Sequence, residues 1–174
     1  MTDPLTGLRN RRYVRRHLEG VLRGTEAAIL MLDVDRFKAI NDSYGHAAGD
    51  AALREVAERL RAHVRAADVV ARYGGEEFMV VLAGAQADYA LGVADRLRAA
   101  LGAEPIAVGH AHLPITASIG LAVAAPGTDA AKAIAAADAA LYRAKARGRN
   151  RVEAAEAEDF DPPDGGTPGA ADSA

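Results

Sequence analysis

The sequence contains no cysteine, and only 5% of its 174 residues are aromatic. Without cysteine, the chain can form no disulfide framework, no thiolate metal site and no thiol nucleophile. It also lacks an apolar run of the roughly 20 residues that a membrane-spanning helix needs, and it shows no charged-then-apolar leader. These absences exclude disulfide-stapled and membrane-spanning proteins, so we expect a soluble, cytoplasmic protein.

Positive charge is missing from one end of the chain. The stretch 153–174 has no lysine or arginine and holds seven of the 24 acidic residues, so the net charge of -3 hides a mildly basic body. Such a body suits a small polyanionic ligand, whereas the acidic stretch and the lack of interleaved basic and aromatic residues argue against nucleic-acid binding. We expect residues 1–152 to form one domain and residues 153–174, rich in Ala, Glu, Asp, Pro and Gly, to be a disordered tail.

A glycine pair marks the centre of the sequence. Gly74 and Gly75 lie between two apolar runs, 68–73 and 78–83, and two carboxylates, Glu76 and Glu77, follow directly. This pattern predicts a β-hairpin with a two-residue turn in which both glycines have φ > 0. The small turn leaves room for a ligand to approach the backbone. An ordinary exposed hairpin tip with two surface glutamates is the alternative.

A continuous apolar run at 27–34 predicts a central strand that is buried on both faces. Asp33 lies near its carboxyl end, where α/β folds commonly bind ligands. If the hairpin lies beside this strand, Asp33 comes close to Glu76 and Glu77. Carboxylates on adjacent strand ends are what Mg²⁺ and a triphosphate require. A helix-capping role for Asp33 remains the main competing interpretation.

Periodicity gives the order of the other elements. Helices are predicted after an Asn10 cap as far as Gly24, then at 36–42, from 46 or 49 to 64, at 86–101 and at 130–147. The 86–101 helix is expected to point Leu91, Ala94, Leu97 and Leu101 inward. Further strands are predicted within 105–113, at 115–123 and at 151–152. The resulting order, α-β-α-β-β-α-β-α-β, predicts an α/β (α+β) fold. Its plan is palm-type, ferredoxin-like or nucleotidyl-cyclase-like, with a mixed five-stranded sheet flanked by helices.

Five motifs in a fixed order carry a family resemblance. They lie at 3–11, 33–50, 72–78, 116–120 and 137–150. In this set the chain resembles the GGDEF domain of diguanylate cyclases, in its GGEEF form. The resemblance implies that two GTP condense to cyclic di-GMP and two pyrophosphates across a transient antiparallel homodimer. It also implies a regulatory N-terminal domain that is missing from this chain.

The resemblance assigns the metal site. By the family pattern Asp33, the Val34 carbonyl, Glu76 and Glu77 hold Mg²⁺, with Mn²⁺ as an alternative ion. Glu76 matches the acid credited with accepting the proton of the attacking hydroxyl. Phosphoryl transfer depends mostly on positioning and charge neutralisation, which such a site can provide.

The resemblance also assigns the nucleotide contacts. Asn41 and Asp50 match the pair that reads guanine, and His46 matches a position near the substrate. Read without the family, Asn41 is equally a turn residue, Asp50 a helix first-turn acid and His46 a helix cap.

Basic residues and backbone amides are assigned to the triphosphate. Lys145 and Arg149 match the family's phosphate-binding residues, although Lys145 alone could be a solvated helix residue. The backbone amides of Phe37 and Lys38 are expected to meet the β- and γ-phosphates.

Arg65 and Asp68 fit the family's RxxD site, at which bound cyclic di-GMP inhibits the enzyme. Arg96 is a further candidate contact there. A helix-end arginine and a strand-start aspartate are the plain alternative. The two functions to separate are therefore an Mg²⁺-dependent diguanylate cyclase with product inhibition and a catalytically weak cyclic di-GMP or GTP receptor.

Overall fold

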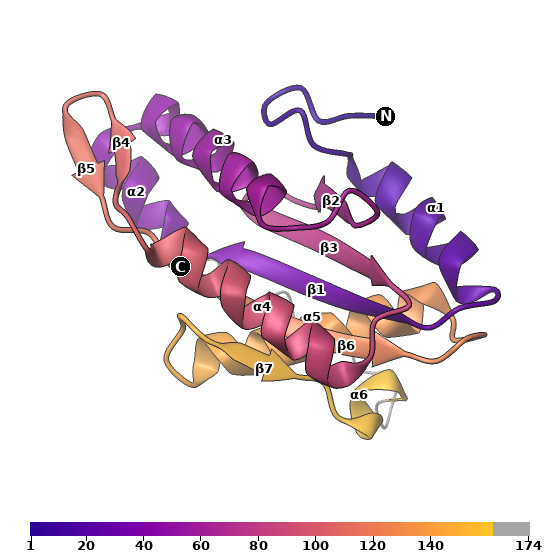
Figure 1. The fold of residues 1–174 in the computed structure, drawn as a ribbon. Coiled ribbons are helices and arrows are strands. Elements are labelled where there is room, and N and C mark those ends of the chain that lie inside the picture. The colour runs from indigo at the N-terminus through magenta and orange to yellow at the C-terminus, as the bar shows by residue number, and fades with distance from the viewer. Residues whose placement is uncertain (162–174) are drawn as a thin grey trace.

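The central strand β1 (Ala27–Val34) is buried along all eight residues, as its apolar sequence predicts. It pairs antiparallel with β3 (Glu77–Ala83) on one side and with β6 (Ala117–Ala124) on the other. β2 (Val69–Arg72) extends the sheet beyond β3, and β7 (Val152–Ala154) pairs parallel with β6. The order β2-β3-β1-β6-β7 makes a mixed five-stranded sheet and confirms the predicted fold class (Figure 1). The computed structural model describes residues 1–161.

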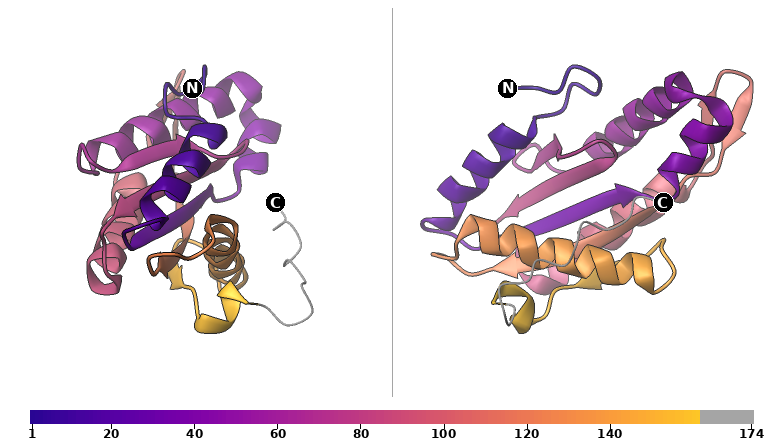
Figure 2. Two further views of the ribbon diagram at one scale, coloured as in Figure 1. Left: turned by 90° about the vertical axis from the view of Figure 1, so that its right-hand side faces the viewer. Right: turned by 180° about the vertical axis from the view of Figure 1, so that it is seen from behind.

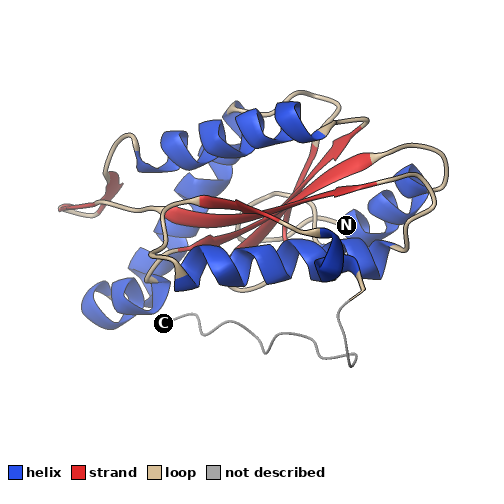
Figure 3. Ribbon diagram, turned by 90° about the horizontal axis from the view of Figure 1, so that it is seen from below, coloured by secondary structure: helices blue, strands red, loops and turns tan. Residues whose placement is uncertain are grey.

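Helices cover both faces of this sheet (Figures 2 and 3). They are α1 (Arg11–Leu22), α2 (Phe37–Tyr44), α3 (His46–Ala62), α4 (Ala87–Gly102), α5 (Ala130–Ala146) and the short α6 (Ala157–Phe160). Because strand side chains alternate, Leu30 and Leu32 of β1 pack with α3 and α4 in one core, while Ile29 and Met31 pack with α1 and α5 in another. Asp33 continues the second set and therefore lies on the α1/α5 face.

Helix α5 lies unusually close to β6 at Gly120. A Cβ atom on this glycine would overlap the carbonyl oxygen of Ala137 and the backbone nitrogen of Leu141. Only a residue without a side chain permits this approach. The contact fixes α5 on the sheet, and Lys145, one turn beyond Leu141, thereby reaches the end of β1.

Two predicted details of the α4 region differ in the structure. Leu91 was expected to point inward, but its side chain is 47% exposed, whereas Ala94, Leu97 and Leu101 are buried. Ala90 takes the inward position one residue earlier, so Leu91 falls outside the buried stripe. The segment predicted to hold one edge strand forms a separate two-stranded hairpin, β4 (Ile106–Val108) with β5 (Ala111–Leu113).

The prediction of disorder from residue 153 onward is wrong for residues 153–161. This segment contains most of β7 and the helical turn α6. Asp159 accepts hydrogen bonds from Arg143 of α5, at 2.7 and 3.0 Å, and Phe160 packs against the core on the α1/α5 face. Composition alone missed these two anchors. The remainder of the predicted tail, 162–174, lies outside the described residues. None of the helices in the described part of the chain combines the length and apolarity needed to cross a membrane.

Candidate active site

Asp33 and Glu77 lie directly opposite each other in the β1–β3 ladder. Opposed residues of an antiparallel pair point to the same face of the sheet, so these two carboxylates are neighbours. Glu76 precedes Glu77, and its carbonyl accepts a hydrogen bond from the Val34 N–H at 3.2 Å. The structure thus brings together all four residues predicted as metal ligands. We call Asp33, Glu76 and Glu77 the carboxylate edge.

The turn that carries the glycine pair is longer than predicted. The N–H groups of Tyr73 and Gly74 both donate to the Glu77 carbonyl, at 2.8 and 3.2 Å. Neither Gly74 nor Gly75 has a positive φ. The prediction of a two-residue turn with both glycines at φ > 0 is therefore wrong.

Arg72 holds this turn in shape. Its Nε donates to the Gly74 carbonyl at 3.2 Å, and its Nη2 donates to the Gly75 carbonyl at 2.8 Å. Nη1 of the same guanidinium forms an ion pair with Asp3 Oδ1 at 3.2 Å. A cation therefore ties the turn to the start of the chain, a long-range contact that the local glycine pattern could not reveal.

Lys145 reaches the carboxylate edge from the last turn of α5. Its Nζ lies 2.6 Å from Asp33 Oδ2, and the two side chains are only 9% and 5% exposed. Sequence reasoning assigned Lys145 to the triphosphate and missed this ion pair. The pair depends on the close approach of α5 to β6, which no local pattern records.

A further acid, Asp138 of α5, faces the same region and was missed by the sequence analysis. Burial, then repulsion from Asp33 and Asp138, raises the pKa of Glu77 above its ordinary value. Burial likewise raises the pKa of Asp138, and Lys145 opposes that rise. The pKa of Asp33 is raised by burial, against the hydrogen bond from Lys145. Asp138 and Lys145 are two helical turns apart, a spacing that could have flagged them as neighbours on one face.

The carboxylate edge suits a hard divalent cation by its donor chemistry. Carboxylates and a backbone carbonyl are oxygen ligands of the kind that Mg²⁺ prefers. Acids that raise one another's pKa are relieved when a cation binds among them. Over residues 1–161, however, no three acidic or histidine side chains form a preassembled metal cluster. Instead, the Lys145 ammonium group forms an ion pair with the Asp33 carboxylate.

Asp35, to which no sequence pattern assigned a role, anchors the loop between β1 and α2. Its side chain is buried and accepts hydrogen bonds from Thr116 Oγ1 at 2.7 Å, Ser118 Oγ at 2.6 Å and the Asn150 N–H at 3.0 Å. Arg149, predicted to bind phosphate, lies in the same turn with a left-handed φ of 64°. Asp35 therefore fixes the loop after β1 relative to the turn after α5.

The N-terminus of α2 lies beside the carboxylate edge. Its N-cap, Arg36, has a left-handed φ of 55° and makes no side-chain capping bond. The first-turn amides of Phe37 and Lys38 thus receive no hydrogen bond from that cap, and amides in this position of a helix commonly bind anions.

Asn41, Asp50 and His46 come together where α2 meets α3. The Asn41 side chain lies so close to Gly49 that a Cβ atom there would overlap Asn41 Oδ1. Asp50 follows Gly49 and is exposed. His46 is exposed one turn earlier on the same face of α3. It makes no capping hydrogen bond, because the N-cap of α3 is Gly45.

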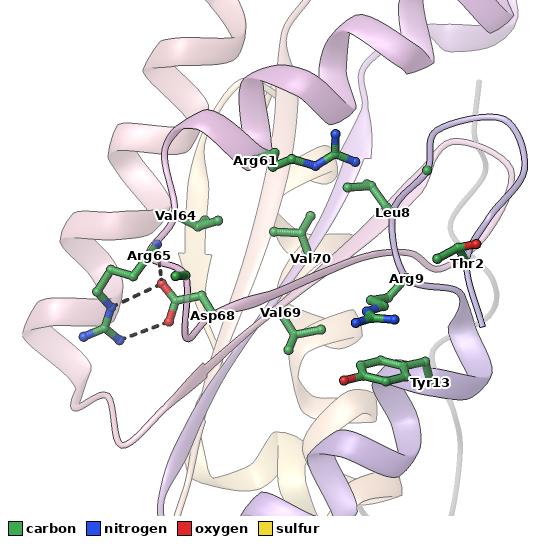
Figure 4. A pocket seen from close by; sticks show the side chains of 12 residues that line it. Thr2, Leu8, Arg9, Tyr13, Arg61, Val64, Arg65, Asp68, Val69 and Val70 are labelled. Carbon is green, nitrogen blue, oxygen red and sulfur yellow. Dashed lines mark hydrogen bonds and ion pairs between the residues drawn. The ribbon is translucent and has the colours of Figure 1, made fainter.

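Arg65 and Asp68 form a second charged site just beyond the C-terminal end of α3 (Figure 4). We call these two residues, together with Tyr89, the arginine corner. Arg65 Nη2 lies 3.0 Å from Asp68 Oδ1, and the Arg65 N–H donates to Asp68 Oδ2 at 2.9 Å. The guanidinium also lies over the Tyr89 ring, 4.9 Å from its centroid. Arg96 is exposed on α4, two turns beyond Tyr89 on the same face.

A cavity of about 710 Å³ adjoins this corner. Its lining includes Arg65 and Asp68 together with two further cations, Arg9 and Arg61 (Figure 4). The Arg9 guanidinium lies 4.3 Å from the centroid of the Tyr13 ring. The space near this corner is thus basic and partly aromatic, and none of its lining residues belongs to the carboxylate edge.

The fold and the carboxylate edge define a palm-type α/β domain with an acidic site at the end of its central strand. Comparison with known families makes the assignment specific: the chain belongs to the GGDEF family, because the family model described as "Diguanylate cyclase, GGDEF domain" matches residues 1–151.

Two curated relatives illustrate the similarity. The response regulator PleD of Caulobacter vibrioides is 42% identical over 160 residues, which cover 87% of this chain and 35% of PleD. The diguanylate cyclase DgcP of Pseudomonas aeruginosa is 44% identical over 161 residues, which cover 89% of this chain and 24% of DgcP. The chain therefore spans about a quarter to a third of the length of these two relatives.

Solved structures agree on the fold. The GGDEF domain of YfiN from Pseudomonas aeruginosa superposes with a TM-score of 0.85 at 37% identity, covering 91% of this chain and 96% of that one. The GGDEF domain of DgcB from Caulobacter crescentus, solved in complex with c-di-GMP, gives a TM-score of 0.84 at 34% identity, covering 89% and 93%.

Proposed function

We propose that this domain is a diguanylate cyclase that condenses two GTP into cyclic di-GMP and two pyrophosphates. The observation that carries the proposal is the pairing of Asp33 with Glu77 across β1 and β3, with Glu76 beside them, in a chain of the GGDEF family. In each half-reaction a 3′-oxygen forms a bond to the α-phosphorus of the other GTP. The bond from that phosphorus to the oxygen that bridges it to the β-phosphate breaks, and pyrophosphate leaves.

The carboxylate edge and its neighbours take separate roles in this reaction. Asp33, the Val34 carbonyl, Glu76 and Glu77 would hold a divalent ion, which would neutralise charge and lower the cost of ionising the hydroxyl. Glu76 accepts the proton of the 3′-hydroxyl. Lys145, Arg149 and the amides of Phe37 and Lys38 bind the triphosphate.

Asn41 and Asp50 select guanine. The Asp50 carboxylate accepts hydrogen bonds from guanine N1–H and the 2-amino group, which adenine cannot offer as a pair. The close approach of the Asn41 side chain to Gly49, the residue before Asp50, supports this pairing. His46 lies on the same face of α3, close to the substrate.

The reaction needs two copies of the chain, because each copy binds one GTP and supplies one half of the site. The domain therefore works as a transient homodimer. Product inhibition acts through the arginine corner, where Arg65 and Asp68, with Arg96 nearby, bind cyclic di-GMP. The complex of DgcB with c-di-GMP is a precedent for ligand binding in a related domain.

The test is product chromatography on purified, nucleotide-stripped protein supplied with GTP and Mg²⁺ over a range of protein concentrations. Cyclic di-GMP is expected, with a specific rate that rises with protein concentration and no product from ATP. A rate independent of protein concentration would contradict the half-site dimer. No product at any concentration, with tight binding of cyclic di-GMP, would instead support a receptor function, which the basic cavity at the arginine corner favours.

A further inference from the structure

The ion pair between Lys145 and Asp33 differs from the other ion pairs of the described chain. It joins residues 112 positions apart, α5 to β1, and both side chains are almost fully buried. The other pairs each have at least one partner that is more exposed than either of these two side chains. Because both charges have left water, each depends on the other for compensation.

Lys145 serves more than one acid. Its positive charge acts on Asp33, Glu77 and Asp138, and it opposes the rise that burial causes in the pKa of each. Arg11 acts only on Glu77 among these three. Within the described chain Lys145 is thus the cation common to these three acids, which is the electrostatic position of a bound metal ion.

We propose that Lys145 holds the place of the divalent cation on Asp33 in the ligand-free protein and releases Asp33 when a triphosphate offers it another anion. This inference rests on the proposed function in taking Asp33 as a metal ligand. The Asp33 oxygen that contacts the ammonium group cannot at the same time coordinate a cation, and two cations in this buried site repel each other strongly. Lys145 therefore lowers the affinity of the site for a metal ion when no nucleotide is bound.

Lysine suits such an exchange. Its ammonium group is a compact charge on a flexible four-carbon stem, so it can turn from a carboxylate to a phosphate without moving the helix. Lys145 lies in the last turn of α5, four residues before Arg149, the other phosphate-binding candidate. Binding linkage then requires that nucleotide and metal strengthen each other's binding by the same factor.

The first test measures Mn²⁺ affinity without nucleotide, from the electron paramagnetic resonance signal of the free ion. Lys145→Met removes the charge and keeps the stem. We expect it to bind Mn²⁺ about tenfold more tightly than the wild type, within the usual range of coupling between sites. Lys132→Met is the matched control on the same helix, because Lys132 pairs with Asp161 at the surface. Equal affinity of wild type and Lys145→Met would overturn the inference.

The second test detects the displacement itself in the wild type and decides the matter if Lys145→Met does not fold. The chain has three lysines, Lys38, Lys132 and Lys145. With an amine-reactive label and mass spectrometry, Lys145 should be protected in the ligand-free protein. Saturating Mg²⁺ should raise its labelling rate several-fold while Lys132 stays unchanged. An unchanged rate at Lys145 under conditions where the metal binds would contradict displacement.

Neither test uses turnover, so the outcome is separate from that of the proposed function. An active cyclase in which Lys145→Met leaves Mn²⁺ affinity unchanged would refute only the place-holding role. An inactive protein in which Mg²⁺ exposes Lys145 would keep that role and refute the cyclase.

Discussion

At both the carboxylate edge and the arginine corner, an aspartate is paired with a cation, yet the two pairs are built differently. Lys145 and Asp33 come from distant segments and are buried. Arg65 and Asp68 are three residues apart, and the Arg65 side chain is 54% exposed. An anionic ligand at the edge must break its pair, whereas Arg65 can keep Asp68 and still present part of its guanidinium to a ligand. Under the proposed function, the arginine corner would bind an anion without losing its ion pair, whereas the carboxylate edge would have to exchange one.

The largest effect is expected from Glu76→Gln at the carboxylate edge. If Glu76 accepts the hydroxyl proton, turnover should fall about 10²–10⁴-fold, the usual contribution of a general base. Binding of cyclic di-GMP at the arginine corner should remain. Product formation and isothermal titration measure the two separately, and Glu58→Gln, an exposed acid of α3, is the control. Turnover that survives in Glu76→Gln would show that this assignment is wrong.

Arg65→Ala tests the arginine corner and should give the reverse of the Glu76→Gln pattern, with weaker ligand binding and unchanged catalysis. Loss of a charge-assisted contact should weaken binding of cyclic di-GMP by about 10–100-fold, measured by titration calorimetry. The initial rate, before product accumulates, should stay at the wild-type value. Arg54→Ala, which removes an exposed arginine from α3, the helix that precedes Arg65, is the matched control. If inhibition by product persists in Arg65→Ala, the corner is not the inhibitory site.

Gly120→Ala tests the framework that delivers Lys145 to Asp33. The added methyl group would overlap the backbone of α5 at Ala137 and Leu141, so we expect a loss of about 1–3 kcal/mol in the free energy of unfolding. Gly92→Ala is the control, because this α4 glycine has open space around it. That change should stabilise the protein by about 0.5–1 kcal/mol. Chemical denaturation measures the free energy of unfolding of both variants. Equal values would mean that α5 can shift to accept the added methyl group at little cost.

The smallest effect is expected at the Arg143–Asp159 pair, whose side chains are 24% and 14% exposed. This pair is more exposed than the Lys145–Asp33 pair, and its arginine is less exposed than Arg65. The hydrogen bond from Arg143 lowers the pKa of Asp159 below its ordinary value of 3.8. At a pH above 3.8, an acid whose pKa is lowered in the folded state stabilises the fold. This stabilisation is lost as the pH falls through the lowered pKa. Asp159→Asn should therefore cost about 1 kcal/mol or less at pH 7. In denaturation at acidic pH the difference from wild type should disappear, and a constant difference would rule out this titration.

Sequence reasoning succeeded where the pattern was local. The apolar run of β1 and the strand after the glycine pair were sufficient to place Asp33 beside Glu77. It failed where a distant residue decided the outcome. The turn at Gly74 is shaped by Arg72 and Asp3, and Lys145 reaches Asp33 only because Gly120 lets α5 approach the sheet.

The prediction of disorder at 153–161, made from composition, was wrong for a similar reason. Few apolar residues follow β7, but Phe160 and the ion pair of Asp159 with Arg143 are enough to hold α6 against α5. Asp138 was missed because a half-buried acid in an alanine-rich helix looks like a surface residue until the helix is docked.

The three hydrogen bonds of Asp35 constrain how this domain can diverge. Thr116, Ser118 and the turn at Asn150 all depend on one carboxylate, so a change at position 35 disturbs three segments at once. Those segments connect the end of β1, which carries Asp33, with the turn that carries Arg149, so no single substitution can move one without affecting the other. Descendants of this sequence can vary widely on the surface, while Asp35 and its partners must be retained or replaced together.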